Sequence, residues 1–296
     1  MAAEHTTKVR LGTAIAIAFA RNPMNLANLG YDMQWISGGC FLLGLGSQVK
    51  PHTHTEKRFS SMWFHPAERM TEIATVIKAI WDCWRATDRS ISRASSITTH
   101  NDPGIQPQAQ FLRITADLYW RLRTADDVRG RRSGRRLHFP PFNTRDSLLK
   151  NTLPALPKGL EKSGRLRSDL EVICATLVDT ADTEEAFAAV KLAARKQLDF
   201  YGSAPAYHPA LACHGWEAVH EKLKRLSKEG RWDDMTNLIS DDIHNEIAVV
   251  GERRETAGKL RARLDAIADG VSIMHNRCPD PHHWSDIVRD LKNSHQ

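Results

Sequence analysis

Hydrophobic and polar residues follow two different patterns along residues 1–84. The mostly apolar run from Val9 to Ala18 predicts a buried strand, and Cys40 to Gly46 predicts a second, shorter one. Between them, Pro23 begins a predicted helix that continues to Ile36 and ends at a Ser-Gly-Gly cluster. A second helix is predicted from Pro66, because its apolar residues fall on one stripe at helical spacing: Met70, Ile73, Ala74, Ile77, Ile80, Trp81 and Trp84.

The alternation of strands and helices resumes after residue 138. The predicted elements are a helical stretch Arg145–Ser163 with a break at Pro154 and Pro157, a strand Leu170–Val178, a helix Glu184–Phe200, a helical insertion at 206–245, a strand Ile247–Gly251, a helix Glu255–Ile267, a strand Val271–Met274 and a helix from Pro281. This order predicts an α/β fold with a parallel sheet. Because no GxGxxG motif follows any strand, a parallel (β/α)8 barrel (TIM barrel), here incomplete, fits better than an open sheet.

The first apolar run permits a second interpretation. Lys8 and Arg10 precede LGTAIAIAFA, which resembles the core of a secretory signal peptide. Glu4 in the basic region, and Gly12 and Thr13 within the apolar core, argue against this alternative. A buried parallel strand explains the same residues, and we expect a cytoplasmic protein.

Length and composition favour a globular, reduced protein. The chain has 296 residues, of which 41% are hydrophobic, so it is long enough to bury a large core. The cysteines are odd in number and lack a CxxC pair, which argues against a disulfide framework or a thiolate zinc site: Cys40, Cys83, Cys174, Cys213 and Cys278. No apolar run approaches the roughly 18 residues needed to span a bilayer. The sequence therefore predicts neither a membrane contact nor a metal site.

Positive charge is concentrated in one segment. Residues 85–136 contain eleven Arg and five Asp but no Lys and no Glu, and this segment alone accounts for the formal net charge of +6. The chain therefore divides into three parts: strands and helices at 1–84, an Arg-rich segment at 85–137, and strands and helices with an insertion at 138–296. We expect the Arg-rich segment to lack a stable fold, because its composition is poor in buried-strand pattern.

Six stretches of the flanking parts carry a family resemblance. They are VRLGTAIAIAFARNPMNLA from Val9, GGCFLLGLGSQVKPH from Gly38, PPFNT from Pro140, DLEVICATLV from Asp169, QLDFYGSAPAY from Gln197 and HGWEAVHEKLKRLSKEGRWDDM from His214. In this order they resemble the luciferase-like monooxygenase superfamily, in particular its deazaflavin-dependent (coenzyme F420) oxidoreductase branch. The resemblance implies a (β/α)8 barrel that binds its cofactor at the carboxyl ends of the strands.

The resemblance also implies where that cofactor lies. In the family, the strand that carries GTAI often ends in a bulge with a non-proline cis peptide against the cofactor ring, here Ala14 and Ile15. The loop after the next strand and a polar residue beyond it complete the implied cofactor-binding set: Ala14, Ile15, Gly44, Gly46, Ser47, Gln48, Val49 and His52. The opening β-α-β of the family barrel, which commonly supplies the catalytic His or acid, is expected to precede Met1 and to be missing. No catalytic residue is therefore implied.

The Arg-rich segment takes the place of the family's fifth strand and phosphate loop without resembling them. Read one base later, codons for Ala116 to Arg136 permit PIYIGGFGPRMTSVAGEVADG, which resembles the missing strand and glycine-rich loop. We therefore predict a frame-shifted segment whose frame is restored before Pro140. The rival interpretation is a nucleic-acid patch at RGRRSGRR, with Tyr119 and Trp120 as stacking residues. A specific nucleic-acid partner is not expected.

The sequence thus predicts an F420-dependent oxidoreductase that transfers a hydride between the deazaflavin and a small organic substrate. An FMN-dependent monooxygenase of the same superfamily is the alternative. A non-catalytic remnant is a third interpretation, because the missing and disrupted segments predict weak activity or none. A homodimer is compatible with all three.

Overall fold

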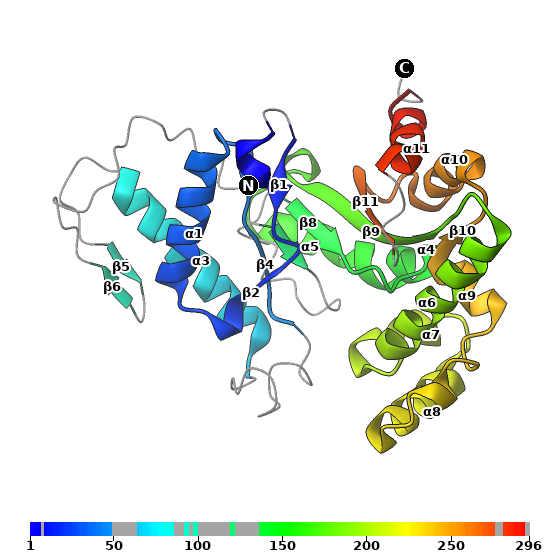
Figure 1. The fold of residues 1–296 in the computed structure, drawn as a ribbon. Coiled ribbons are helices and arrows are strands. Elements are labelled where there is room, and N and C mark those ends of the chain that lie inside the picture. Colours follow the sequence, from blue (N-terminus) through cyan, green and yellow to red (C-terminus); the bar gives the residue numbers. More distant parts are fainter. Residues whose placement is uncertain are drawn as a thin grey trace. The chain divides into compact units, whose positions relative to one another are not determined.

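The computed structural model describes residues 1–6, 9–48, 64–85, 92–94, 97–99, 119–121, 136–275 and 281–293. The chain forms two compact units. Unit 1 comprises Met1–Leu122, Asp127–Leu137 and Lys158–Leu170, and unit 2 comprises Arg123–Asp126, His138–Pro157 and Glu171–Gln296 (Figure 1). Among the described residues, no helix combines the length and the apolar character that a membrane span requires.

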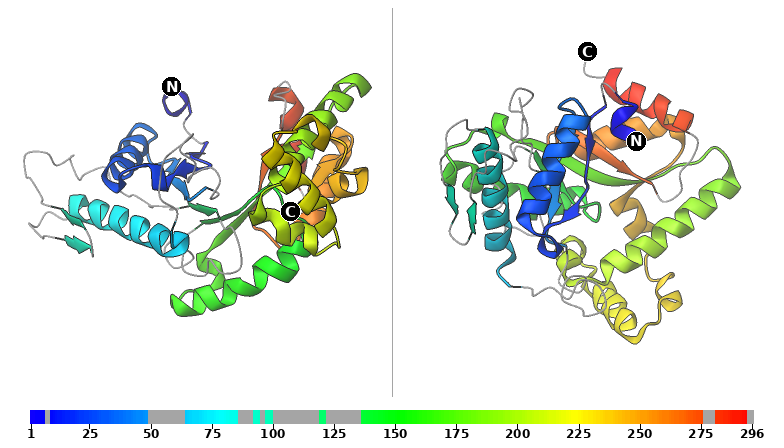
Figure 2. Two further views of the ribbon diagram at one scale, coloured as in Figure 1. Left: turned by 90° about the horizontal axis from the view of Figure 1, so that it is seen from below. Right: turned by 60° about the vertical axis from the view of Figure 1, so that its left-hand side comes forward.

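Two long helices of unit 1 begin at the prolines where the sequence predicted their starts. They are α1 (Pro23–Ile36) and α3 (Pro66–Arg85), which lie against each other (Figure 2). The Asn22 side chain caps α1 by accepting a hydrogen bond from the Met24 N–H at 2.8 Å. Gly30 lets the helices approach closely, because a Cβ at this position would lie 2.7 Å from the Trp81 ring. The Trp81 Nε1–H also donates to the carbonyl of Ala27 at 2.9 Å.

The prediction of a single strand from Val9 to Ala18 is wrong. The chain bends at Ala14, so that the residues before and after the bend belong to two different sheets. The strands of unit 1 are β1 (Leu11–Gly12), β2 (Ala16–Ile17), β3 (Phe41–Leu42), β4 (Gly44–Gly46), β5 (Ser92–Ala94), β6 (Ile97–Thr99) and β7 (Tyr119–Arg121). β1 pairs with β3, whereas β4 pairs with β2 and β7, all in parallel; β5 and β6 form an antiparallel pair. Most of the predicted Arg-rich segment lies outside the described residues, so its expected disorder and frame shift remain predictions.

Unit 2 contains a parallel sheet centred on β9 (Glu171–Asp179). β10 (Ala248–Val250) pairs with the last residues of β9, with Val250 opposite Asp179. β11 (Gly270–Met274) pairs with the earlier part, with Met274 opposite Leu177. The last two residues of β8 (Arg136–Phe139) belong to unit 2, and its first two belong to unit 1. Because β9, β10 and β11 are parallel, their carboxyl ends meet at one edge of the sheet.

The helices of unit 2 match the predicted alternation and the predicted insertion. They are α4 (Arg145–Ser147), α5 (Leu156–Lys162, shared with unit 1), α6 (Glu184–Gly202), α7 (His208–Ala212), α8 (Glu217–Glu229), α9 (Asp241–Ile247), α10 (Arg253–Leu264) and α11 (Pro281–Asn293). The predicted break before α5 is confirmed, since a π turn and a 3-10 turn carry the chain from Leu148 to Ala155. A Pro in a helix interior removes one backbone donor, which explains the irregular turns there.

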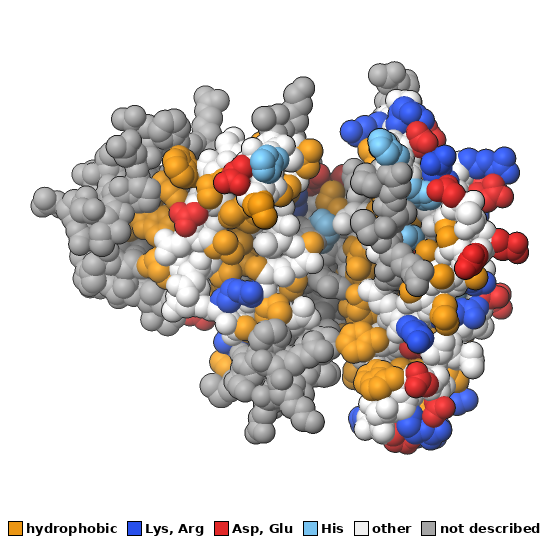
Figure 3. All heavy atoms as spheres, in the orientation of Figure 1, with side chains coloured by type: hydrophobic (Ala, Val, Ile, Leu, Met, Phe, Trp, Pro, Cys, Tyr) orange, Lys and Arg blue, Asp and Glu red, His pale blue; other side chains and the backbone are white. Residues whose placement is uncertain are grey.

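Two apolar clusters hold unit 2 together. One joins Phe142 and Leu177 to the insertion helices, and the other joins Val178 to α10 and α11. On the face drawn in Figure 3, charges of both signs are interspersed over α8, α10 and α11. Such a mixed surface is typical of solvent-exposed helices.

Candidate cofactor site

The bend between β1 and β2 contains a cis peptide bond between Ala14 and Ile15. Neither residue precedes proline, so the cis form is unusual at this position. The predicted cis peptide is therefore confirmed. That it lies against a cofactor ring stays a prediction.

Side-chain hydrogen bonds hold this bend against β4. The Thr13 hydroxyl donates to the carbonyl of Gly44 at 2.8 Å and accepts from the Gly44 N–H at 3.0 Å. It therefore satisfies both backbone groups of Gly44, which explains why strand pairing is interrupted between β1 and β2. On the other side of the bend, Ile15 packs onto Gly46, where a Cβ would lie 2.1 Å from its Cδ1. Only glycine leaves this space free.

The loop after β4 supplies polar groups beside the same bend. Ser47 and Gln48 are half-buried, and the Ser47 hydroxyl donates to the carbonyl of Gln48 at 3.0 Å. Gln48 has a φ of 62°, in the left-handed region that is costly for a residue with a side chain. The structure thus brings six of the predicted site residues together. Val49 and His52 lie outside the described residues, and their roles remain predictions.

In unit 2, two arginines fix the loop that follows β8. Arg263 is on α10 and donates to the carbonyls of Asn143 and Glu246, each at 2.6 Å. Arg145 donates in the opposite direction, to the carbonyls of Ala262, Arg263 and Asp265 at 3.2, 2.7 and 3.2 Å. These carbonyls belong to the C-terminal end of α10, where a cation is favourable.

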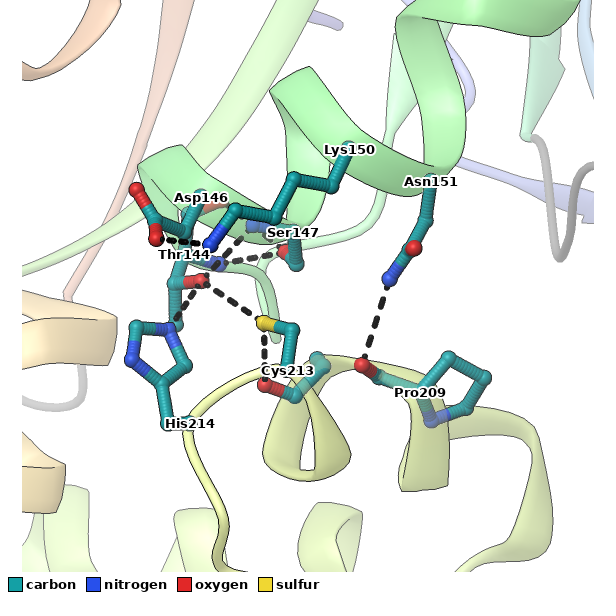
Figure 4. A network of polar contacts seen from close by, with 9 residues as sticks. Thr144, Asp146, Ser147, Lys150, Asn151, Pro209, Cys213 and His214 are labelled. Carbon is teal, nitrogen blue, oxygen red and sulfur yellow. Dashed lines mark hydrogen bonds and ion pairs between the residues drawn. The ribbon is translucent and has the colours of Figure 1, made fainter.

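Thr144 follows this loop and joins it to the insertion helices (Figure 4). The buried Thr144 hydroxyl lies 2.7 Å from Nε2 of His214 and accepts from the Ser147 N–H at 3.0 Å, which caps α4. The His214 ring stacks on Trp216 with centroids 4.6 Å apart. The arrangement fixes the orientation of an ionisable ring at the carboxyl end of a strand, which is where barrel enzymes carry their chemistry.

A wholly buried contact between a histidine and a carboxyl group ends β9. His244 on α9 places its Nε2 2.6 Å from Oδ2 of Asp179, and neither side chain is exposed. Within the described part of the chain, Asp179 Oδ1 and His244 Nδ1 have no hydrogen-bond partner. The pair fastens α9 of the insertion to the end of the central strand. The Asp179 carbonyl also accepts a hydrogen bond from the Gly251 N–H at 3.1 Å, which holds the loop after β10 at the same place.

A cavity of 620 Å³ opens beside the ends of β9 and β10. Its lining comes from the first turns of α6 and α10 and the loops before them: Ala181, Asp182, Thr183, Glu184, Phe187, Gly251, Glu252, Arg253, Arg254 and Glu255. Four of these are acidic and two are basic, so the cavity does not favour an anion despite the two helix N-termini. Among the described residues, no group of three or more His, Cys, Asp or Glu is placed to hold a metal ion.

Sequence reasoning missed the polar groups of unit 2. Asp179 ends an apolar run and is a charged residue at the end of a barrel strand, which is a recognisable signal. Its partner His244 is 65 residues away, and no local pattern connects the two. Thr144 and His214 fall in the matching stretches PPFNT and HGWEAVHEKLKRLSKEGRWDDM, although their contact is not readable from either stretch.

The chain is similar to a known protein family and to proteins of Mycobacterium tuberculosis. The model of the family described as luciferase-like monooxygenase matches residues 1–112 and 137–270. The unmatched residues 113–136 lie within the Arg-rich segment. A Mycobacterium tuberculosis protein (strain ATCC 25618 / H37Rv), named uncharacterized protein Rv1360, is 41% identical over 274 residues, covering 92% of this chain and 79% of its own length. Another protein of that strain, Rv3520c, whose name proposes a coenzyme F420-dependent oxidoreductase, is 25% identical over 263 residues, covering 83% and 73%.

Solved structures share the fold. The coenzyme F420 dependent tetrahydromethanopterin reductase from Methanopyrus kandleri aligns with a TM-score of 0.76 at 16% identity, covering all of this chain and 86% of that one. The oxygenating constituent of 3,6-diketocamphane monooxygenase from Pseudomonas putida, solved with FMN, aligns with a TM-score of 0.58 at 15% identity, covering 98% and 79%. The predicted fold class, a TIM barrel of the luciferase-like type, is confirmed by this likeness.

Proposed function

Because this chain belongs to the luciferase-like monooxygenase family and is an oxidoreductase by that membership, we propose that it is an F420-dependent enzyme. It transfers a hydride between the deazaflavin ring and a small organic substrate. The observation that carries the proposal is the surface formed by the Ala14–Ile15 bend and the glycines of β4. The name of the relative Rv3520c, and that of the Methanopyrus kandleri reductase, favour the deazaflavin over FMN.

The unit 1 site fits a flat ring system. The bend is held from behind by Thr13 and by the close packing of Ile15 on Gly46, so its backbone is fixed. A rigid surface that matches its ligand loses little conformational entropy on binding. Ala14 and Ile15 would form the wall against the ring. Gly44 and Gly46 would allow the backbone to approach it.

The polar end of the site suits the heteroatoms of such a ring. Ser47 and Gln48 follow β4 and are half-buried, which leaves their side chains within reach of a ligand at the bend. We propose that they orient the ring, together with Val49 and His52. The bound deazaflavin would supply the hydride chemistry, and the protein would supply position and electrostatics.

The experiment that tests this function is a fluorescence titration of the purified protein with coenzyme F420 and, separately, with FMN. Moderate salt suppresses nonspecific attraction between the Arg-rich segment and the phosphate of either cofactor. We expect saturable quenching by F420 and a weaker response to FMN. Tighter binding of FMN would replace the proposal with the FMN-dependent monooxygenase.

A matched pair of glycine variants locates the site. In Gly46→Ala, the new Cβ would collide with Ile15 and displace the wall of the bend, so F420 affinity should fall by at least an order of magnitude. Gly258→Ala adds the same methyl group to an open position on α10, where the new Cβ would have no described atom within 4 Å apart from its chain neighbours and the helix's own backbone, and it should leave affinity unchanged. Equal affinities in both variants would show that the ligand binds elsewhere. A folded sample that binds neither cofactor would support the non-catalytic remnant.

A further inference from the structure

Five aromatic rings in unit 2 form a continuous series from the core to the surface. They are Phe142, Tyr207, Tyr201, Phe200 and Trp232. Successive ring centroids are 5.2, 5.5, 6.0 and 6.1 Å apart, within the range of direct contact between aromatic pairs. The series begins in the loop after β8 and ends beside the 3-10 turn that follows α8 (Asp233–Met235).

Exposure increases along this series. Phe142 is 2% exposed and belongs to the main apolar cluster, and the two tyrosines pack against that cluster. Phe200 is 36% exposed and Trp232 is 50% exposed. Burial of apolar area explains the inner rings, but it explains little of a half-exposed indole. The outer two rings therefore invite an explanation beyond core packing.

Tyrosine and tryptophan are the side chains that most readily lose a single electron, and electron exchange between them requires closely spaced rings. We propose that this series conducts single electrons between the surface at Trp232 and the interior at Tyr207. Phe200 is the bridge between Trp232 and Tyr201 and is not itself oxidised. The Tyr201 hydroxyl accepts a hydrogen bond from Nε2 of Gln197 at 3.0 Å, which holds that ring in place.

For an oxidant of the radical class, such as hydroxyl radical, the transfer starts at the exposed indole. The radical takes one electron from Trp232 and becomes hydroxide, which the indole proton converts to water. Tyr201 then gives an electron to the Trp232 ring and its phenolic proton to water, and Trp232 takes up a proton; Tyr207 restores Tyr201 in the same way. A thiol in solution finally gives an electron and a proton to the tyrosyl radical and becomes a thiyl radical. Because the tyrosyl radical is the weaker oxidant, transfer runs from Trp232 toward the tyrosines, and the buried Met235 of the same cluster faces the weaker of the two radicals.

The route can be tested in this direction without any cofactor. Azide radicals, generated by pulse radiolysis, oxidise exposed tryptophans of the full-length protein to tryptophanyl radicals and are reduced to azide. We expect tryptophanyl absorption to decay by intramolecular transfer while tyrosyl absorption rises. The rise should be independent of protein concentration.

Four variants separate the route from general oxidation. Trp232→Phe should lose most of the tyrosyl rise, and so should the double variant Tyr201→Phe with Tyr207→Phe. Phe200→Leu keeps every oxidisable ring but removes the bridge, so the rise should slow. Trp35→Phe is the matched control, because Trp35 is 66% exposed on α1 and contacts no other aromatic ring among the described residues.

The expected result is loss in the first two variants, slowing in the third and no change in the control. An unchanged rise in Trp232→Phe, or in the double tyrosine variant, overturns the proposal. A rate unaffected by Phe200→Leu overturns the assigned bridge and with it the route. Each substitution is at a partly exposed ring or removes only hydroxyl groups, so the fold is expected to persist.

Discussion

The strand ends of the two units are built from different kinds of groups. In unit 1 the candidate surface consists of backbone and small side chains, held by Thr13 and by the contact of Ile15 with Gly46. In unit 2 the strand ends carry buried polar side chains, among them the hydrogen-bonded pair of Asp179 with His244. The unit 1 site is therefore defined by shape, and the strand ends of unit 2 by buried polar contacts.

This difference decides how each region responds to substitution. A site defined by shape fails when volume is added, whereas a buried polar contact fails when one partner is removed. Adding a methyl group at Gly46 creates a steric conflict, but truncating His244 leaves the buried carboxyl group of Asp179 without its partner. Variants in unit 2 should therefore lose more stability than binding, and those in unit 1 more binding than stability.

The largest effect is expected at the buried pair of Asp179 and His244. His244→Ala should lower the free energy of unfolding by about 3–5 kcal/mol, because it leaves the wholly buried Asp179 unpaired. Urea unfolding followed by circular dichroism measures this loss. The surface control is Arg254→Ala, which removes the ion pair with Glu252 in an exposed setting and should cost less than about 1 kcal/mol. Similar losses of unfolding free energy in His244→Ala and Arg254→Ala would contradict the distinction between buried and exposed pairs.

The next effect is expected at the arginine that ties the β8 loop to α10. Arg145→Ala removes hydrogen bonds to three carbonyls at the helix C-terminus and should cost about 2 kcal/mol. Arg231→Ala is the comparison, because Arg231 pairs with Glu229 and Asp234 at the surface. Chemical denaturation of both variants measures the difference. An equal loss of unfolding free energy in the two variants would mean that the carbonyl contacts of Arg145 stabilise the protein no more than a surface ion pair does.

A smaller effect sharpens the comparison between units. Asn22→Ala removes the cap of α1 in unit 1, and Thr183→Ala removes the cap of α6 in unit 2, each at a cost of about 1 kcal/mol. We expect amide hydrogen exchange to accelerate mainly in the unit that carries the substitution. Equal acceleration in both units from either variant would mean that they unfold as one.

The smallest effect is a gain in stability at Asp199. Burial raises the pKa of this carboxyl to about 7, and the nearby Arg195 only partly opposes the shift. Because the folded-state pKa lies above the ordinary value of 3.8, the ionised carboxylate opposes folding increasingly as pH rises from about 4 to 7.

Asp199→Asn should therefore stabilise the protein at pH 8 and make little difference at pH 4. The gain is limited because the amide is also buried, at a position where the carboxylate oxygens find no hydrogen-bond partner among the described residues. Thermal unfolding of both proteins across this pH range isolates the effect. A gain that does not vary with pH would contradict the raised pKa.

The sequence predicted features that depend on local conformation better than contacts between residues far apart in the chain. Pro23 and Pro66 fixed the starts of α1 and α3, because proline has a local conformational preference that requires no partner. The bend at Ala14 was expected only through the family resemblance, and the strand around it was predicted as continuous. The split depends on Thr13 contacting Gly44, 31 residues away.

The buried polar contacts of unit 2 could not be predicted in the same way. Periodicity located β9 and the insertion, but it carries no information on which charged side chains meet. His214 and Thr144 are 70 residues apart, and only the fold brings them within 2.7 Å. The frame-shift hypothesis for the Arg-rich segment also stays a prediction, and sequencing the gene beside an intact relative would test it.

Arg145 and Arg263, which each bond to the backbone of the other's segment, have a consequence for the order in which the chain can fold during synthesis. Arg145 reaches the carbonyl of Arg263, 118 residues later, and Arg263 reaches back to the carbonyl of Asn143. The loop after β8 leaves the ribosome long before α10 exists, so it waits without its partners while the insertion helices are made. Its final conformation is reached only when the end of α10 has emerged, and a nascent chain stalled before that point would expose the loop to proteases.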